Sequence, residues 1–358
     1  MKVLIKKSVL ETMLLNTQAY LEKKDLSQIT SHVLLLSEDG QFTLKATDYE
    51  IGLCYFTKEV KVATTGNATA NGKKFLDIVK GLKDSKEDDI TLETINDYLY
   101  IKQNSSKYKL PMLNPNDFPP FPQVDHKPKF NINSSTLVRS IKKIAPAIDT
   151  NNPKFELNGS LINIKDNAIN LVATDTKRLA IVKIEHPTEE NFSLIIPRKA
   201  IGEIQKLFFD TIEMFYDENT LIAQASNFIF FTKLINGKFP DYERIIPKNK
   251  NFRIQLSRES MVESIKQIAI ISNEIKITFK SDKVVFESLN DDNIEAKTEI
   301  DYKTGLDEDI FLAVNSRYML DFLSHIESQT FILGFNDSGL PFTLESDNFI
   351  TIVMPIML

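Results

Sequence analysis

The chain has 358 residues, 42% of them hydrophobic, which is enough for two or three domains with buried cores. Its 43 Lys and Arg residues and 49 Asp and Glu residues give a formal charge of −6, which argues against a protein that coats nucleic acid with its whole surface. The single cysteine, Cys54, excludes an intrachain disulfide and a zinc site built from cysteines, and it fits a reducing cytoplasm.

The first third of the chain is predicted to combine strands with a helix. Runs rich in β-branched, aromatic and aliphatic residues at 33–36 and 51–56 predict strands. Cys54 lies in the second run, and we expect a buried small hydrophobe there, because no nearby histidine would lower the pKa of its thiol. Residues 73–82 carry apolar side chains at helical spacing and predict a helix. Six of the 14 prolines then gather within 111–128, which predicts a linker.

The middle and last thirds continue this alternation. Leu137, Ile141 and Ile144 form an apolar stripe at helical spacing, and Ser134 and Ser135 precede it as a helix-cap signal. The other predicted elements are strands over 161–164, 169–172, 228–232 and 275–279, and helices over 198–207, 261–269 and 316–325. The prediction is thus a chain of short antiparallel strands with pairs of helices between them.

An internal repeat organises these elements. Residues 2–53 align with 129–180 at a constant shift of 127 residues without a gap, so that the Ala-Thr-Asp of 46–48 meets the Ala-Thr-Asp of 173–175. The helix predicted over 137–145 matches 261–269 at a shift of 124, which reveals a third copy. Each copy is predicted to be an α+β unit of two helices packed on antiparallel sheet. The expected domains are residues 1–125, 126–247 and 248–358.

Positive charge concentrates on the repeated helices, although the chain as a whole is acidic. Basic side chains lie opposite the apolar stripes at Lys73, Lys80, Arg139, Lys142, Lys143, Arg198 and Lys199. For a single helix, a solvated face that carries lysine is the simpler interpretation. Because the pattern recurs in two copies, we also consider a surface that contacts the phosphates of a polyanion without reading its bases.

No pattern in the chain demands an enzyme. The approach to a phosphate-binding loop at 66–74 has five residues rather than four between its glycines, and Lys74 stands where Ser or Thr is required. The four histidines lack metal-ligand spacing, and the acidic runs at 87–89, 291–292 and 307–309 are typical of solvated turns. We therefore predict no catalytic residue, no metal and no cofactor.

Three segments, together with the triple repeat, resemble a known family. They are ATDTKRLA at 173–180, GKFPDYER at 237–244 and the terminal VMPIML at 353–358. In this order and over the whole chain they resemble the bacterial sliding clamp, the β subunit of DNA polymerase III. The resemblance implies the DNA clamp fold, three domains per chain, and a head-to-tail homodimer that closes into a ring of six domains around duplex DNA.

The resemblance also implies the protein's work and partners. A clamp tethers the replicative polymerase to DNA for processive synthesis without a catalytic site of its own. Its partners would be the polymerase catalytic subunit, the clamp loader, and other polymerases and repair proteins that carry short clamp-binding peptides. A cytoplasmic, nucleoid-associated location follows from that role.

Matching the family residue by residue suggests three sets of site residues. Two further DNA contacts fall at Lys24 and Asn151, which the internal shift of 127 also pairs. A hydrophobic peptide pocket between the second and third domains would be formed by Lys154, Leu157, Thr174, Thr176, Arg178, Leu179, Pro240, Arg244, Ile245, Pro341, Ile352, Met354, Pro355 and Ile356. The subunit contact would join Tyr108 and Leu110 of one chain to Ile270 and Ile271 of the other.

In this pocket, apolar residues would take the anchors of an extended peptide, with Arg178 and Thr174 at the edge to fix its register. The simpler interpretation is that Leu157, Leu179 and Ile352 are ordinary core residues of strands. The sequence departs from the family pattern at Thr176-Lys177, where Gly-His is common, and at Met357, where Arg is common.

Two alternatives to the clamp remain open from the sequence. One is a three-domain scaffold that binds peptides without encircling DNA. The other is a hydrolase or transferase that uses Asp48, Asp175 and a further acid that the sequence does not reveal, although the recurrence of the two aspartates at the ends of strand-like runs favours a structural turn.

Overall fold

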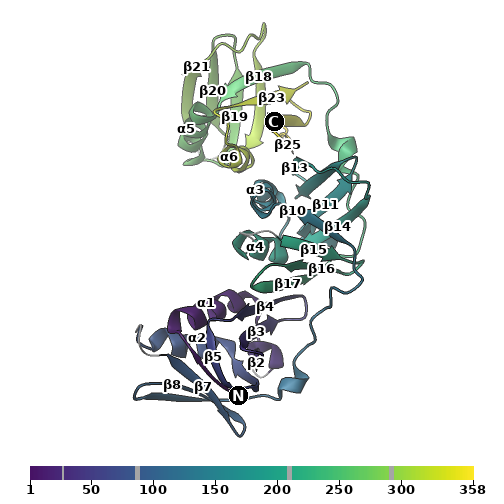
Figure 1. The fold of residues 1–358 in the computed structure, drawn as a ribbon. Helices are drawn as coiled ribbons and strands as arrows, with labels where there is room; N and C mark the ends of the chain where they lie inside the picture. The colour runs from purple at the N-terminus through teal and green to yellow at the C-terminus, as the bar shows by residue number, and fades with distance from the viewer. Residues whose placement is uncertain (26–27, 85–88, 208–211, 290–293) are drawn as a thin grey trace. The chain divides into compact units, whose positions relative to one another are not determined.

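The structure is a computed structural model that describes residues 1–25, 28–84, 89–207, 212–289 and 294–358. It divides into two compact units, Met1–Ser134 with Phe208–Leu234, and Ser135–Leu207 with Ile235–Leu358 (Figure 1). The second repeat expected from the sequence therefore contributes to both units.

Unit 1 consists of two antiparallel sheets and a pair of helices, α1 (Lys7–Thr17) and α2 (Gly72–Gly81), that pack against each other. The five-stranded sheet has the order β5 (Val60–Thr64), β1 (Lys2–Ile5), β7 (Ile90–Ile95), β8 (Tyr98–Gln103) and β9 (Ser106–Pro111). The eight-stranded sheet has the order β10 (Lys129–Ile132), β15 (Ile212–Tyr216), β16 (Thr220–Gln224), β17 (Phe228–Lys233), β4 (Ile51–Thr57), β3 (Gln41–Thr47), β2 (His32–Glu38) and β6 (Gly66–Asn71).

Unit 2 also combines two antiparallel sheets with helices, but its described residues contain four helices. Its eight-stranded sheet has the order β14 (Phe192–Pro197), β11 (Gly159–Lys165), β12 (Ala168–Thr174), β13 (Arg178–Glu185), β25 (Phe349–Val353), β24 (Phe342–Ser346), β23 (Thr330–Phe335) and β18 (Phe252–Ser257). The four-stranded sheet has the order β21 (Lys297–Asp301), β20 (Lys283–Ser288), β19 (Glu274–Phe279) and β22 (Ile310–Asn315). Its helices are α3 (Ser134–Ile144), α4 (Arg198–Leu207), α5 (Arg258–Ala269) and α6 (Ser316–His325).

Short 3₁₀ helices lie in the connections of both units. They are η1 (Gln18–Tyr20), η2 (Ile29–Ser31), η3 (Pro115–Asp117), η4 (Ala145–Ala147), η5 (Phe155–Asn158) and η6 (Tyr242–Ile245). The last two flank the candidate peptide site, since η5 precedes β11 and η6 follows the linker that leaves β17.

The predicted fold class is confirmed by these elements, because the paired strands are antiparallel and each repeat supplies two helices. The stripe of Leu137, Ile141 and Ile144 is completely buried, as its helical spacing predicts. One detail of the prediction was wrong: α3 begins at Ser134 itself, so the residue before the helix is Asn133 and not a serine.

Candidate peptide-binding site and nucleic-acid interface

The turn between β12 and β13 is held by the side chains of its own Thr-Asp pair. Thr174 Oγ1 donates to the carbonyl oxygen of Arg178 at 2.6 Å and accepts from the N–H of Thr176 at 3.1 Å. Asp175 Oδ1 accepts the N–H groups of Lys177 and Arg178 at 3.0 and 2.9 Å. The Asp175 carboxylate therefore has the structural role of an Asx turn, which removes the support for a catalytic acid at this position.

Arg178 is buried, with 7% of its side chain exposed. Its Nε donates to Asp175 Oδ2 at 3.0 Å, its Nη1 donates to Asp321 Oδ2 of α6 at 2.6 Å, and its Nη2 donates to the carbonyl oxygen of Pro146. The guanidinium also lies 4.5 Å from the ring centre of Tyr318. Each guanidinium nitrogen thus already has a partner within the protein. Arg178 thereby positions the end of β13 against α6 and η4, next to the predicted pocket.

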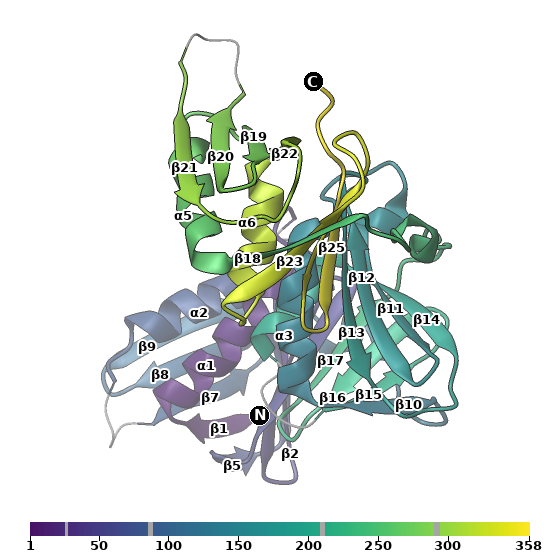
Figure 2. The same ribbon diagram turned by 90° about the horizontal axis from the view of Figure 1, so that it is seen from above.

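Next to this turn lies an apolar cluster that brings three predicted pocket residues together. The strands β13 and β25 lie side by side (Figure 2). In this antiparallel pair, Leu179 stands opposite Ile352. Both side chains and that of Leu157 are 2% exposed, and they share one cluster with Phe239 and Tyr242. These residues come from η5, two strands, the linker before η6 and η6 itself, so only the fold makes them neighbours.

Tyr242 closes one side of the cluster. Its hydroxyl accepts a hydrogen bond from Asn163 Nδ2 at 3.0 Å, and burial raises the pKa of its phenol. The linker itself turns at Gly237, whose φ of +149° is open mainly to glycine, and a Cβ there would lie 2.6 Å from Cγ of Glu156. Glycine at this position lets the linker approach η5 and bring Tyr242 to the cluster.

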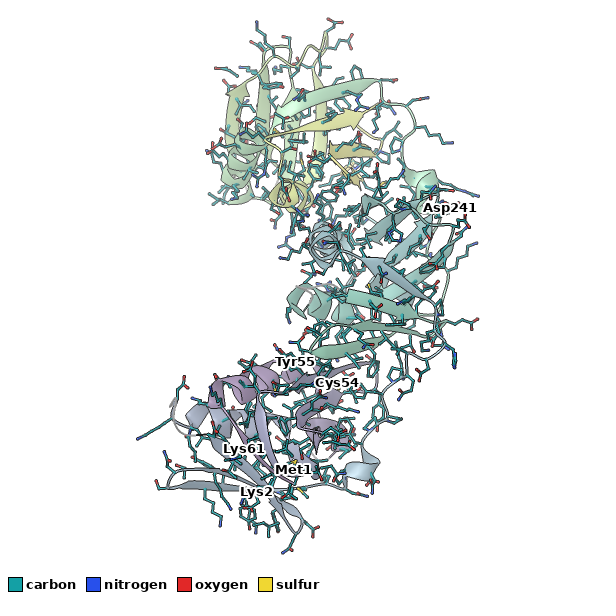
Figure 3. All side chains as sticks on the ribbon, in the orientation of Figure 1. Met1, Lys2, Cys54, Tyr55, Lys61 and Asp241 are labelled. Carbon is teal, nitrogen blue, oxygen red and sulfur yellow. The ribbon has the colours of Figure 1, made fainter. Side chains whose placement is uncertain are left out.

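Around the cluster lie predicted pocket residues that are open to solvent. Ile245 and Met354 are each 44% exposed, although both are large and apolar. Lys154, Thr176, Pro240 and Arg244 are exposed, and Pro341, Pro355 and Ile356 are partly exposed. Arg244 Nε pairs at 2.7 Å with Oδ2 of Asp241, the linker residue labelled in Figure 3. The arrangement is a buried apolar floor beside exposed apolar and charged side chains.

The C-terminal segment is fixed in place by its backbone. The N–H of Met354 donates to the carbonyl oxygen of Lys177 at 2.9 Å, and the N–H of Ile356 donates to that of Ala313 at 2.8 Å. One residue that the sequence analysis missed lies in the turn before Pro341: Leu340 is 50% exposed. The sequence did contain a signal for Leu340, because it is an apolar residue in a turn directly before a predicted pocket proline.

The predicted basic residues of the helices lie on solvated faces. Lys73 and Lys80 of α2, Arg139 and Lys142 of α3, and Arg198 and Lys199 of α4 are exposed, and Lys143 is partly exposed. Some of them also have partners within the protein: Lys143 Nζ donates to Asn348 Oδ1 at 3.3 Å, and Arg198 Nη1 donates to the carbonyl oxygen of Ile148 at 3.1 Å.

The two loop positions matched to DNA contacts share one local geometry. Glu22 accepts the N–H of Lys24 at 2.6 Å, and Asp149 accepts the N–H of Asn151 at 3.2 Å, so an acid two residues earlier shapes each loop. The side-chain hydrogen bond from Asn152 lowers the pKa of Asp149, as do its backbone N–H partners. Lys24 and Asn151 are both exposed.

The predicted subunit-contact residues differ in exposure. In unit 1, Tyr108 is 38% exposed on the edge strand β9, whereas Leu110 on the same strand is only 7% exposed. In unit 2, Ile270 and Ile271 follow α5 and are 81% and 39% exposed. Leu110 therefore belongs to the core of unit 1 in the single chain, and Tyr108, Ile270 and Ile271 present apolar surface.

The described residues were compared with two kinds of site, a cluster of metal ligands and a membrane-spanning helix. Over these ranges, no cluster of three His, Cys, Asp or Glu side chains has metal-binding geometry, and no helix has the length and apolar character to cross a membrane. The acidic run 291–292 and residues 87–88 lie outside the described residues. Cys54 is 7% exposed, and burial raises the pKa of its thiol to about 11, which confirms a buried hydrophobe.

Comparison with known proteins decides the family. Models of the DNA polymerase III beta subunit match three times, with the N-terminal domain at 1–122, the central domain at 131–241 and the C-terminal domain at 243–357. The chain belongs to the family of DNA polymerase III β subunits. As expected from the sequence resemblance, it is a sliding clamp of DNA replication with three tandem clamp domains.

Individual β clamps are similar over the full length. The beta sliding clamp of Helicobacter pylori strain J99 is 40% identical, over 96% of this chain and 94% of that protein. The structure of the H. pylori beta clamp bound to a DNA ligase peptide superposes with a TM-score of 0.94 at 39% identity, with both chains fully covered. The DNA polymerase III β subunit from Pseudomonas aeruginosa has a TM-score of 0.94 at 26% identity, again with full coverage. The β clamp family consists of processivity factors.

Proposed function

We propose that this β clamp takes the peptides of its partner enzymes on the apolar site beside β13 and β25. The observation that carries the proposal is the juxtaposition of the buried Leu157, Leu179 and Ile352 with the exposed Ile245 and Met354. A peptide that covers the two exposed side chains would bury apolar area, while the buried floor gives it a fixed shape. The DNA ligase peptide bound by the H. pylori clamp is the model for such a ligand.

In this proposal Arg178 acts through the site's geometry. Its guanidinium fixes the end of β13, from which Leu179 projects, so Arg178 positions the site at whose edge it lies. Thr174 has the same role through its hydrogen bond to the Arg178 carbonyl. Lys154, Thr176 and Arg244, which are exposed, and Pro240, Pro341, Pro355 and Ile356 complete the proposed site.

A binding titration tests the peptide site. Anisotropy of a fluorescein-labelled DNA ligase peptide should show Met354→Ala and Ile245→Ala each weakening binding about tenfold, since each removes roughly 1–1.5 kcal/mol of apolar contact. Ile95→Ala is a matched control, because Ile95 is 43% exposed in unit 1 and Ile245 is 44% exposed. Equal affinities for all three variants and the unmodified chain would place the peptide elsewhere.

We also propose that the chain forms a homodimeric ring whose basic helix faces contact DNA phosphates. Support comes from family membership and from the solvated positions of Lys73, Lys80, Arg139 and the other predicted residues. Tyr108, Ile270 and Ile271 would join the subunits, and Leu110, on the same strand as Tyr108, would support the contact from the core of unit 1. The domain boundaries near 125 and 247, the absence of a catalytic site and a cytoplasmic location are part of the same proposal.

Loading onto DNA tests the ring. The clamp should remain on a nicked circular plasmid after loading and should leave when the plasmid is cut to a linear form. Retention on linear DNA, or a monomer by light scattering at micromolar concentration, would contradict the ring and would favour a peptide-binding scaffold. Double substitution of Lys73 and Lys80 by Gln should reduce the salt dependence of DNA binding by about two phosphate contacts.

A further inference from the structure

The linker between β17 and β18, residues 235–251, carries two residues of the proposed peptide site, Pro240 and Ile245. Within this stretch, all of which the structure describes, η6 is the only regular element, and Ile245 is its last residue. Figure 2 shows the linker leaving η6 and running to β18. Because no strand ladder holds the linker, the position of Ile245 depends on the side chains that attach the linker on either side of it.

The part of the linker before Ile245 is attached to η5 and β11. Tyr242 is only 6% exposed in the apolar cluster, where its hydroxyl accepts the hydrogen bond from Asn163. Glu243 pairs with Lys165 of β11, and the hydrogen bond between them raises the pKa of the lysine. These contacts fix the first part of the linker.

The part after Ile245 is attached to β24 by an ion pair. Lys250 Nζ donates to Oε1 of Glu345, and the two side chains are 11% and 23% exposed. Glu345 also accepts from Thr343 Oγ1 at 2.7 Å and pairs with Arg253 Nη2 at 3.5 Å. Burial alone would raise the pKa of Glu345, but the hydrogen bonds from Lys250 and Thr343 outweigh burial and lower the pKa. The contact of Lys250 is therefore a charge-assisted hydrogen bond to an ionised carboxylate.

Two further hydrogen bonds at this end are exposed to solvent. Asn336 Nδ2 donates to the carbonyl oxygen of Asn249 at 3.0 Å, and Asn336 Oδ1 accepts the N–H of Asn251 at 2.7 Å. Water can replace exposed hydrogen bonds at little cost. The ion pair of Lys250, which is mostly shielded from water, is therefore the stronger attachment.

Gly334 of β23 gives Lys250 the space to reach Glu345. A Cβ at Gly334 would lie 2.6 Å from Cδ of Lys250 and 2.7 Å from Oγ1 of Thr343. The stem of the lysine therefore passes directly over this glycine. A glycine in a strand often marks such a close approach.

Strand pairing connects this attachment with the floor of the peptide site. Gly334 stands opposite Thr343, Thr343 stands opposite Ile352, and Ile352 stands opposite Leu179. Directly opposite residues of a sheet share a face. Lys250 thus crosses the same face of the sheet on which the floor residues Ile352 and Leu179 lie.

We propose that the Lys250–Glu345 ion pair positions Ile245 for contact with a partner peptide. Ile246 packs against the apolar cluster and Lys250 follows in the same span, so the backbone next to Ile245 is held at both points. Without the ion pair, this span would become ordered only when the peptide binds, and ordering it costs conformational entropy. The inference rests on the proposed peptide site, and Lys250 and Glu345 act in it as positioning residues.

The test uses the full-length clamp and the fluorescein-labelled DNA ligase peptide. Lys250→Met removes the charge and keeps an unbranched stem, and it should weaken peptide binding three- to tenfold. The upper limit is the tenfold loss expected for Ile245→Ala, through which the effect must pass. In the Ile245→Ala chain, Lys250→Met should change the affinity less than twofold, because no Ile245 contact is left to lose. Equal losses in the two backgrounds would show that Lys250 does not act through Ile245 and would overturn the proposal.

Gly334→Ala tests the ion pair without removing a charge. The added Cβ would displace the stem of Lys250 from its place over β23, so peptide binding should weaken at least twofold. If Gly334→Ala binds the peptide as tightly as the unmodified chain, the seating of Lys250 has no influence on the site and the proposal is overturned.

Lys127→Met is the matched control. Lys127 lies in the linker of unit 1, pairs with Asp217 and is 19% exposed, which is close to the 11% of Lys250. Its replacement should leave peptide affinity within twofold. A loss as large as that of Lys250→Met would assign the effect to general stability and would contradict the positioning role. Thermal melting of each variant confirms that it is folded.

The result for Ile245→Ala separates this inference from the proposed function. If Ile245→Ala weakens peptide binding and Lys250→Met does not, the peptide site stands and only the positioning role is overturned. If Ile245→Ala binds the peptide normally, the proposed site fails, and the inference fails with it.

Discussion

Two strand junctions, β4 with β17 in unit 1 and β13 with β25 in unit 2, follow the same kind of turn. They differ in the side chains that come after the turn. In the first, Thr47 Oγ1 donates to the Ile51 carbonyl oxygen at 2.8 Å, and Asp48 Oδ1 accepts two backbone N–H groups at 3.1 Å. In the second, Thr174 and Asp175 make the corresponding bonds. The recurring Thr-Asp pair therefore stabilises the turn in both copies. Any difference in function between the two junctions depends on the residues that come after the turn.

The residues after the turn differ in size and in their surroundings. At the first junction Gly52 stands opposite Phe231, whose ring packs edge-on against Phe121 at 5.0 Å. At the second, Leu179 stands opposite Ile352. The first junction is filled by its own aromatic rings. The second has a smaller aliphatic pair with exposed apolar neighbours, and this is the difference on which the proposed peptide site depends.

The residue that ends the turn also differs, and its replacement should give the largest effect. Arg178→Ala would leave the carboxylates of Asp175 and Asp321 without their main cation. We expect a loss of about 3 kcal/mol in the free energy of unfolding, at the low end for a buried ion pair because both acids are partly exposed. Urea unfolding measures the loss, and the ligase peptide should bind more weakly because the end of β13 is no longer fixed.

Arg244→Ala is the control for this prediction. Arg244 also pairs with an aspartate, but 86% of its side chain is exposed. Its removal should change the free energy of unfolding by less than about 0.5 kcal/mol. Similar losses in the free energy of unfolding for the two arginine variants would show that the buried ion pairs of Arg178 stabilise the protein no more than the exposed pair of Arg244.

Gly52→Ala should damage the first junction and spare the second. A Cβ at Gly52 would overlap the ring of Phe231, so the ring must move, at a cost of about 1–3 kcal/mol. Peptide affinity should stay unchanged. Gly202→Ala is the opposite control: the position in α4 is open, and the free energy of unfolding should rise by up to about 1 kcal/mol. A stable Gly52→Ala variant would contradict the close approach described for this junction.

Lowering the pH should reduce the stability of unit 1 through protonation of His32. Its side chain is 6% exposed at the start of β2, and desolvation, with a smaller effect of Lys74, lowers its pKa from 6.5 to about 4. The unfolded chain therefore binds this proton between pH 6.5 and 4 while the folded chain does not, so stability falls as the pH drops through that window. The second repeat has Gly159 at the matching position.

Screening by solvent reduces this effect to about 1–2 kcal/mol. Between about pH 7 and pH 4.5, the free energy of unfolding should fall by that amount more in the unmodified chain than in His32→Gln. The same pH dependence in both proteins would assign it to other groups.

The smallest effect is expected at the tips of the two turns. Thr176 has a φ of +71° and Tyr49 a φ of +73°, a left-handed conformation that non-glycine residues adopt at a cost. Thr176→Gly should raise the free energy of unfolding by at most about 1 kcal/mol, because strain relief is partly offset by the greater freedom of glycine in the unfolded chain. Calorimetry would detect this change, and a drop in stability would show that the Thr176 conformation is not strained.

Much of the fold could be predicted from local patterns. The helix over Leu137, Ile141 and Ile144 and the turn at Ala173-Thr174-Asp175 are where the spacing and the turn chemistry placed them. The proposed peptide site could not be predicted from local patterns. Leu157, Leu179 and Ile352 have the pattern of ordinary core residues, and they are indeed buried. Their grouping came from family resemblance, and the exposed Leu340 was missed.

The repeat, the helix faces and the turns are set by the sequence alone, since they depend on residues a few positions apart and on copies that can be aligned. The partners of individual side chains are set by the tertiary structure. No local pattern indicated that Asp321 of α6 accepts a hydrogen bond from the Arg178 guanidinium at 2.6 Å. Likewise, Lys250 and Glu345 are far apart in the chain, and the fold brings them together as an ion pair. Pairing register and long-range packing determine which side chains meet, and no local pattern contains that information.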